Sequence, residues 1–277
     1  MLLKIFAVLS ALAAVLTGYL SDAFAALAWL WVLPLTFAGV FVGLLVLAFL
    51  VLWAVSATVK TDVPQEKDDP FFRRLIEVYI EAILTILRMK VEPVGLEQTP
   101  KDGRFLIVCN HLSLLDVLVL LVYFPRRELT FITKQENMSM FIIGKLMHKI
   151  QCLPLNRDND REALKTILKA IALIKEDKAN VGLFPEGTRS LDSKLHGFRS
   201  GGFKIAQKCG VPIVVCTIRN TNRVFRNFLG LKPTHIPLHL LEVIGAEELK
   251  GVTTVDISNR VRGIMAADLG PELVAEE

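Results

Sequence analysis

The chain has 277 residues and carries 32 Lys and Arg against 28 Asp and Glu, a net charge of +4 that is too balanced to indicate a nucleic-acid-binding protein. Hydrophobic residues make up 52% and charged residues 22%, so the chain is richer in apolar residues than an ordinary soluble domain but too charged for a polytopic transporter. The 17 Gly, 12 Pro and 4 Cys, with no repeat period, exclude collagen-like, disordered and disulfide-scaffold proteins. The length allows one to two domains.

The hydrophobic excess is concentrated at the N-terminus. The first 60 residues contain only three charged side chains, which are Lys4, Asp22 and Lys60. Because a helix needs about 20 apolar residues to cross ~30 Å of hydrocarbon, we expect two membrane helices, at about residues 3–21 and 35–57. A short connection that contains Asp22 and Pro34 would join them.

We therefore expect two domains, a membrane anchor at 1–60 and an α/β domain at 61–277. Lys4 and Lys60 would lie on the same side of the membrane, and the positive-inside tendency places that side, with the second domain, at the cytoplasmic face of the cell membrane. The first apolar run also fits the hydrophobic core of a signal peptide, and this alternative stays open.

A charged linker follows the apolar segments, from residue 60 to residue 69. Asp69 and Pro70 form a helix start signal, a capping residue followed by proline at the first helical position. The helix predicted at 70–88 has a broad apolar stripe flanked by arginines. It fits a helix packed on a sheet or a helix in the lipid headgroup layer, and both can hold at once.

Beyond residue 90, short β-branched runs alternate with helical patterns. The expected strands are Arg104–Cys109, Leu129–Ile132, Cys152–Leu155, Asn180–Phe184, Pro212–Ile218 and Leu238–Ile244. The expected helices are Leu114–Tyr123, Met140–His148, Asp160–Lys175, Gly202–Lys208 and Thr254–Met265. Strands separated by helices imply βαβ units, so the sequence predicts an α/β fold with a mainly parallel mixed sheet flanked by helices on both faces.

Polar residues follow four of the expected strands. In open α/β sheets the chemistry lies at the carboxyl ends of the strands, where the loops converge. The residues at these ends are Asn110-His111, Lys134, Arg157 and the run Pro185-Glu186-Gly187-Thr188-Arg189. We expect this edge of the sheet to carry the functional site.

His111 and Asp116 are five residues apart, at the junction of a predicted strand and a helix that Ser113 would cap. A carboxylate that bonds one imidazole nitrogen fixes the tautomer and leaves the other nitrogen as a base near neutral pH. The chain has no GxSxG sequence that would supply a protein nucleophile. This pattern predicts a His–Asp general base that activates a hydroxyl or amine of the substrate itself.

The run Phe184–Ser190 predicts a tight turn at the sheet edge, and Arg189 offers a two-pronged donor suited to phosphate. Lys134 and Arg157 are candidates to add positive charge to the same opening. The absence of GxxxxGK[ST], GxGxxG and HExxH disfavours nucleotide hydrolysis, nicotinamide chemistry and zinc proteolysis. The four cysteines form no CxxC pair and indicate no metal site, and we expect Cys109, Cys152 and Cys216, each in an apolar run, to be small buried residues.

The two sequence blocks Asn110-His111-x-Ser113-x-x-Asp116 and Phe184-Pro185-Glu186-Gly187-Thr188-Arg189 resemble those of the glycerolipid acyltransferase family. The resemblance covers about residues 70–245, and the blocks have the order and separation of the family. Two weaker blocks also fit, at Leu155-Asn156-Arg157 and at Val211–Val215. The family also implies a two-helix membrane element at the N-terminus.

The resemblance implies that His111 takes the proton from the free sn-2 hydroxyl of lysophosphatidic acid while Asp116 orients the imidazole. The hydroxyl would attack an acyl thioester on coenzyme A or acyl carrier protein, with no acyl-enzyme, and give phosphatidic acid. No cofactor is expected beyond the acyl-CoA or acyl-ACP co-substrate. A phospholipid bilayer is the expected partner, and nucleic acid is not.

The resemblance also implies that Lys134, Arg157 and Arg189 hold the glycerol phosphate and that Glu186, Gly187 and Thr188 shape that opening. Three alternatives remain open from the sequence. One is a related acyltransferase that acts on another lysophospholipid or a lyso-aminolipid. The others are a thioesterase, in which water is the acceptor, and a non-catalytic lipid-binding protein of the membrane.

Overall fold

The computed structural model describes residues 1–25, 27–124, 128–156 and 159–275. The chain divides into two compact units, Met1–Asp62 and Val63–Glu277. The first is a helical hairpin and the second is an α/β domain, which carries both sequence blocks.

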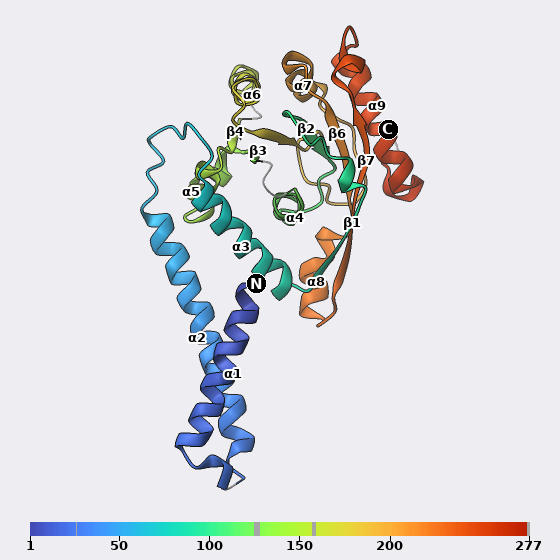
Figure 1. Cartoon of the computed structure of the whole chain (residues 1–277). Helices are drawn as coiled ribbons and strands as arrows, with labels where there is room; N and C mark the ends of the chain where they lie inside the picture. Colours follow the sequence, from blue (N-terminus) through green and yellow to red (C-terminus); the bar gives the residue numbers. More distant parts are fainter. Residues whose placement is uncertain (26, 125–127, 157–158, 276–277) are drawn as a thin grey trace. The chain divides into compact units, whose positions relative to one another are not determined.

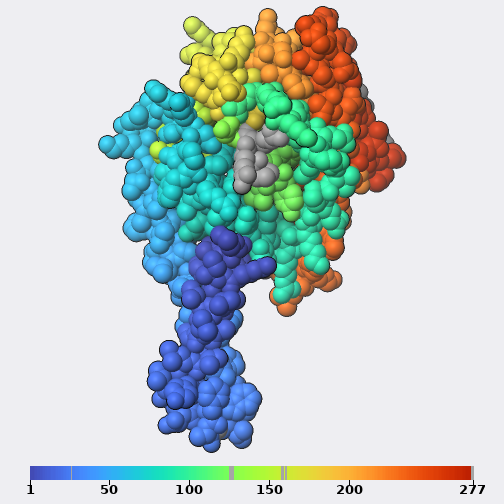
Figure 2. All heavy atoms as spheres, viewed as in Figure 1, coloured from blue at the N-terminus to red at the C-terminus, as the bar shows by residue number. Residues whose placement is uncertain are grey.

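The N-terminal unit consists of helices α1 (Leu2–Leu20) and α2 (Trp29–Ala57) with one 3-10 turn between them (Ala23–Ala25). Both helices are long and apolar enough to cross a membrane, which indicates membrane association. They lie side by side, and their atoms form one continuous body in the space-filling view (Figure 1, Figure 2). Small buried residues recur every four positions on the inner face of α1, at Ser10, Ala14 and Gly18. Such residues let two helices approach closely.

The second helix differs from the sequence-based expectation at its start. It begins at Trp29, so Pro34 lies inside the helix and not in the connection. Proline removes one backbone donor, but apolar membrane helices tolerate it because local adjustments satisfy the freed carbonyl. The uninterrupted apolar run on both sides of Pro34 therefore outweighs the helix-breaking tendency of proline.

Helix α3 (Pro70–Ile86) opens the α/β domain. As predicted, Asp69 caps it: Asp69 Oδ1 accepts hydrogen bonds from the backbone N–H groups of Phe71 (3.1 Å) and Phe72 (3.3 Å). One face of α3 is buried against the sheet through Ile76, Ile80 and Leu84. Phe71, Ile83 and Ile86 of the same helix remain exposed. The sheet-packing interpretation is thus confirmed, and the headgroup-layer interpretation stays a prediction for the exposed face.

The domain is built on a seven-stranded sheet with the order β1-β7-β6-β2-β5-β3-β4 (Figure 1). The strands are β1 (Met89–Val94), β2 (Leu106–Cys109), β3 (Leu129–Lys134), β4 (Leu153–Leu155), β5 (Asn180–Leu183), β6 (Ile213–Ile218) and β7 (Thr234–Ile244). All neighbouring pairs are parallel except β6 and β7. The predicted fold class, a mainly parallel mixed sheet flanked by helices, is confirmed.

Two features of the sheet were not expected from the sequence. Strand β1 was missed because Lys90, Glu92 and Pro93 interrupt its apolar pattern. Strand β7 starts at Thr234, four residues earlier than predicted, and runs antiparallel to β6. These two strands add one antiparallel edge and leave the carboxyl ends of β2, β3, β4, β5 and β6 at a common edge.

Helices cover both faces of the sheet. They are α4 (Leu115–Tyr123), α5 (Ile143–Lys149), α6 (Asp160–Lys175), α7 (Lys204–Cys209), α8 (Val224–Leu229) and α9 (Thr254–Leu269). One apolar core lies between the sheet and α3 and α4, and the other between the sheet and α6, α7 and α9. Figures 1 and 2 show α6, α7 and α9 side by side across the second face, in yellow, orange and red.

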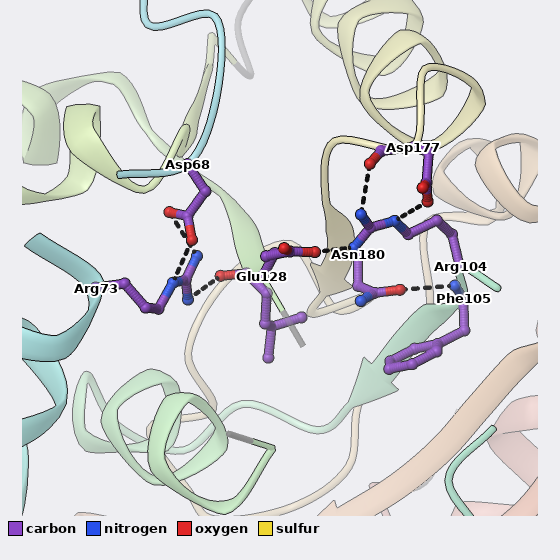
Figure 3. A network of polar contacts seen from close by, with 8 residues as sticks. Asp68, Arg73, Arg104, Phe105, Glu128, Asp177 and Asn180 are labelled. Carbon is purple, nitrogen blue, oxygen red and sulfur yellow. Dashed lines mark hydrogen bonds and ion pairs between the residues drawn. The ribbon is translucent and has the colours of Figure 1, made fainter. Parts of the chain in front are cut away.

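A polar network holds the amino ends of the strands together (Figure 3). Arg104, just before β2, pairs with Glu128, before β3, and with Asp177, before β5, at 2.6 Å from the latter. The side chain of Asn180 accepts a hydrogen bond from the backbone N–H of Phe105 at 2.9 Å. Arg104, Glu128 and Asp177 are therefore paired with one another at the amino edge of the sheet. The loops of the two sequence blocks lie at the opposite, carboxyl edge.

Candidate active site

His111 and Asp116 lie in contact, as the sequence predicts. Strand β2 ends at Cys109, and the loop after it turns into α4, which carries Asp116 as its second residue. His111 Nδ1 lies 2.8 Å from Asp116 Oδ2, with 13% of the histidine side chain and none of the aspartate exposed. Because a carboxylate only accepts, this bond places a proton on Nδ1 and leaves Nε2 to take a proton from a bound molecule.

The Asp116 carboxylate is held by three more donors. Asp116 Oδ2 accepts the backbone N–H groups of Leu112 and Ser113, each at 2.7 Å, and Oδ1 accepts the hydroxyl of Thr221. The expected cap is only partly right, because Ser113 Oγ accepts the Leu115 N–H at 3.3 Å but the helix begins at Leu115. Since a buried charge needs partners, this set of donors explains how Asp116 is tolerated with no exposed surface.

Aromatic stacking fixes the plane of the imidazole. The His111 ring stacks on Phe184, with centroids 4.1 Å apart and an angle of 21° between the rings. Phe184 in turn stacks on Phe131 at 5.8 Å. A Cβ at Gly182 would lie 2.3 Å from the Phe131 ring, so only glycine leaves room for this ring.

Asn110 joins the loop of His111 to the end of strand β6. Its side chain donates to the Ile218 carbonyl at 2.9 Å and accepts the Ile218 N–H at 2.8 Å. Asn110 is almost fully buried, so these bonds extend the β2–β6 pairing by one side chain. The two loops that supply His111 and Thr221 are thereby held in register.

Glu186 supports the site from below the turn and does not face outward. Its Oε1 accepts the backbone N–H of His111 at 2.8 Å, and its Oε2 accepts that of His196 at 3.1 Å. The pKa of this carboxyl is raised, because the effect of burial outweighs the two N–H bonds, which lower the pKa. The Ser190 N–H also donates to the His111 carbonyl at 2.8 Å. The second sequence block is therefore bonded directly to the backbone of His111.

The turn that contains Glu186 presents Arg189, and Arg199 from a later segment packs against this turn. Gly187 adopts φ +72°, a conformation that favours glycine, and its N–H closes the turn on the Phe184 carbonyl at 3.1 Å. A Cβ at Gly187 would lie 3.0 Å from Arg199 Cδ and Nε, so the Arg199 side chain occupies that space. Thr188, Arg189 and Arg199 are exposed, and no described residue forms an ion pair with either arginine.

Comparisons with known proteins give the family. A family model described as Acyltransferase matches residues 90–219. The chain is 32% identical over 208 residues to the 1-acyl-sn-glycerol-3-phosphate acyltransferase of Chlamydomonas reinhardtii, over 73% of this chain and 61% of that protein. It is 32% identical over 182 residues to a protein of Mycoplasma pneumoniae named a probable 1-acyl-sn-glycerol-3-phosphate acyltransferase, over 63% of this chain and 67% of that one.

The chain belongs to the glycerolipid acyltransferase family. The resemblance predicted from the two sequence blocks is thus confirmed. The chain spans less than two thirds of the length of the Chlamydomonas protein. The crystal structure of PlsC, the lysophosphatidic acid acyltransferase of Thermotoga maritima, has the same fold, with a TM-score of 0.60, 24% identity and coverage of 74% of this chain and 83% of that one.

Of the predicted phosphate ligands, Lys134 lies apart from the dyad and Arg157 lies outside the described residues. Lys134 ends β3 at the same edge of the sheet, but β5 lies between β3 and β2, a separation of about 10 Å. Lys134 Nζ pairs with Glu136 at 2.9 Å, and both side chains are more than half exposed. Arg157 lies outside the described residues.

The sequence prediction missed Thr221 and Arg199, because neither is near the two blocks in the chain. The fold brings Thr221 to Asp116 across 105 residues and brings Arg199 to Gly187 through the bond from the Arg199 N–H to the Pro185 carbonyl at 2.8 Å. A signal existed for Thr221, since polar residues at the end of a parallel strand converge on this edge.

The two thiols on β2 and β6 are poorly suited to act as nucleophiles. Cys109 and Cys216 are fully buried beside each other on β2 and β6, and burial raises the pKa of both thiols well above the ordinary value. No group of three or more metal-ligating side chains gathers within the part of the chain that the structure describes. The site thus combines a histidine bonded to a buried carboxylate with a neighbouring turn whose arginine, Arg189, is exposed.

Proposed function

We propose that this chain transfers an acyl chain from a thioester to the sn-2 hydroxyl of 1-acylglycerol-3-phosphate and so produces phosphatidic acid. The observation that carries the proposal is the His111 imidazole, which is bonded through Nδ1 to a buried carboxylate beside an arginine-bearing turn. The names of the similar proteins of Chlamydomonas reinhardtii and Mycoplasma pneumoniae support the choice of acceptor.

The proposed reaction uses His111 first as a base and then as an acid. His111 Nε2 takes the proton of the sn-2 hydroxyl while the oxygen attacks the thioester carbonyl and forms a C–O bond. The tetrahedral intermediate then collapses, the C–S bond breaks, and the leaving thiolate takes the proton back from Nε2. Asp116 stays ionised, keeps the proton on Nδ1 and stabilises the imidazolium. Acid–base help of this kind accelerates reactions by ~10²–10⁴-fold.

The acceptor phosphate would be bound by Arg189, two residues after Gly187, and by Arg199, which packs against Gly187, with Lys134 and Arg157 as further candidates. Arginine binds phosphate through two parallel hydrogen bonds, and both guanidinium groups are exposed. Glu186 and Gly187 shape this opening, since the carboxylate holds the loop and the missing side chain makes room for Arg199. Thr188, also exposed, lines its rim.

The donor in this proposal is acyl-CoA or acyl-ACP, and the chemistry needs no other cofactor and no metal. The α1–α2 hairpin would hold the enzyme in the phospholipid bilayer, where its acceptor resides. We propose that the α/β domain lies on the cytoplasmic face, because Lys4 and Lys60 near the outer ends of the hairpin favour that side.

The test is a product assay on the detergent-purified full chain. Palmitoyl-CoA or palmitoyl-ACP is supplied with and without lysophosphatidic acid, beside the variant His111→Ala. Phosphatidic acid that forms only with lysophosphatidic acid, and is lost in the variant, supports the proposal. Thiol release without phosphatidic acid would contradict it and indicate a thioesterase, or another acceptor that a panel of lysophospholipids and lyso-aminolipids would identify.

A further inference from the structure

Thr221 holds the dyad from outside both sequence blocks. It follows β6, in the loop where the 3-10 turn Thr221–Arg223 begins, and its side chain is fully buried. Its hydroxyl donates to Asp116 Oδ1. No other described residue donates to this oxygen, because His111, Leu112 and Ser113 all bond Oδ2.

The distribution of donors gives Thr221 a distinct effect. The three contacts on Oδ2 come from the loop 111–113. Without the hydroxyl of Thr221, the other oxygen, Oδ1, would have no donor among the described residues. A buried carboxylate oxygen without a donor is costly, and the group can turn about its Cβ–Cγ bond to relieve it. A donor fixed in the loop after β6 holds Oδ1 in place and thereby keeps Oδ2 directed at His111 Nδ1.

The loop of Thr221 is itself rigidly placed. Asn110 bonds both backbone groups of Ile218, three residues before Thr221, and so ties the end of β6 to the residue next to His111. Asn220 adopts a left-handed conformation (φ +66°) and its side chain donates to the His235 carbonyl at 3.0 Å. The hydroxyl of Thr221 is therefore presented to Asp116 by a loop that is held on both sides.

We propose that Thr221 is a positioning residue of the general base: it fixes the plane of the Asp116 carboxylate and, through it, the tautomer and orientation of His111. The proposal rests on the proposed function for its kinetic consequence, but its structural consequence at His111 does not depend on which acceptor is used. Thr221 touches no substrate in this scheme and acts only through Asp116.

The fold supplies a matched control for Thr221. Thr217, on β6 four residues earlier, is also buried, and its hydroxyl donates to the carboxylate of Asp268 at 2.6 Å. Asp268 bonds His239 and Arg219 and has no described bond to the dyad. Thr217→Val therefore removes the same kind of hydrogen bond from the same strand end without affecting Asp116.

The experiment compares Thr221→Val, Thr221→Ser and Thr217→Val in the full chain in detergent. We expect Thr221→Val to lower kcat about 10- to 100-fold, the range for a lost hydrogen bond to a charged group, with the KM of acceptor and thioester within about 2-fold. Thr221→Ser keeps the hydroxyl and should restore most of kcat. Thr217→Val should keep the wild-type kcat per folded molecule.

A second readout is independent of turnover. In ¹⁵N-histidine-labelled protein, the proton on His111 Nδ1 gives a downfield signal that is identified by its absence from His111→Gln. We expect this signal to shift or disappear in Thr221→Val and to stay in Thr217→Val. An unchanged signal in Thr221→Val, or equal losses of kcat in Thr221→Val and Thr217→Val, would overturn the role of Thr221. Failure of the proposed function is recognised separately, as absence of phosphatidic acid from the wild type.

Discussion

Among the described residues, two clusters each join a histidine and a threonine to one aspartate. The dyad cluster consists of His111, Asp116 and Thr221, and the α9 cluster consists of His239, Asp268 and Thr217. In both clusters the ring Nδ1 lies 2.8 Å from a carboxylate oxygen. A His–Asp distance therefore does not by itself distinguish a base from a structural contact.

The difference between the clusters lies in what balances the carboxylate. Asp268 also bonds the guanidinium of Arg219 at 3.0 Å and joins α9 to the end of β6. Burial raises the pKa of Asp268, but the bonds from Thr217, His239 and Arg219 outweigh it and hold that pKa below its ordinary value. Asp116 has no cationic partner among the described residues except the imidazole, so its charge acts on His111. An aspartate neutralised by arginine fixes a helix, whereas one without arginine can stabilise an imidazolium.

The largest expected effect separates the two histidines. His111→Ala removes the base and should lower acyl transfer by about 10³-fold, within the ~10²–10⁴-fold range of acid–base catalysis. His239→Ala should leave kcat within about 2-fold, because the His239 ring bonds Asp268 and has no described bond to the dyad. Both are measured as phosphatidic acid formed per folded molecule. If both substitutions inactivate the protein equally, the assignment of His111 as the base and of His239 as a structural contact is wrong.

The next effect concerns the charge of Asp116. Asp116→Asn keeps an oxygen for the backbone donors of Leu112 and Ser113 but loses the negative charge that favours the imidazolium. We expect kcat at pH 7 to fall by about 10²-fold or more, with substrate KM little changed. Steady-state kinetics of the purified full chain measure this split. A wild-type kcat in Asp116→Asn would show that His111 needs no carboxylate partner.

The comparison extends to the arginines. Arg219 is paired with Asp268, whereas Arg189 and Arg199 are exposed and have no described ion-pair partner. We expect Arg189→Gln and Arg199→Gln each to raise the KM for lysophosphatidic acid about 10-fold, since each removes one charged contact to phosphate. Lys208→Gln, at the far end of α7, is the control and should change no kinetic constant. If only the thioester KM rises, the two arginines bind the donor instead.

The sequence predicted the local features of the site and missed those made by long-range packing. The His111–Asp116 contact was foreseen because both residues lie within five positions of one strand–helix junction. Thr221 and Asn110 act across 105 and 108 residues, which a local pattern does not reveal. Lys134 was expected at the phosphate site because it ends a strand at the correct edge of the sheet. The sequence does not reveal that β5 lies between β3 and β2, and this strand order sets the distance between Lys134 and the dyad.

The same reasoning applies to the fold. Strands such as β2 and β6 were predicted because their sequences are continuous apolar runs, and both are buried on both faces, as in parallel sheets. Strand β1 lies at the edge of the sheet and has charged residues and a proline, so its sequence carries no such signal. Pro34 shows the converse error, in which a local helix breaker is tolerated inside a long apolar helix.

The smallest expected effect is on stability and concerns Asp268. At pH 7 the substitution Asp268→Asn removes the ion pair with Arg219 and weakens the bonds from Thr217 and His239, so the free energy of unfolding should fall by about 1–2 kcal/mol. The kcat of the folded protein should be unchanged, in contrast to Asp116→Asn. Thermal unfolding of the full chain in detergent, followed by circular dichroism, measures the loss.

The pH dependence of this loss identifies its cause. The pKa of Asp268 in the folded state lies below its ordinary value of 3.8, so the stabilisation is fully present above about pH 4 and disappears as the pH falls through the folded-state pKa. The wild type and Asp268→Asn should therefore differ most near neutral pH and converge below pH 3.8. A difference that stays constant down to pH 3 would mean that Asp268 contributes through shape and not through its charge, and the α9 cluster would then no longer be the charged counterpart of the dyad cluster.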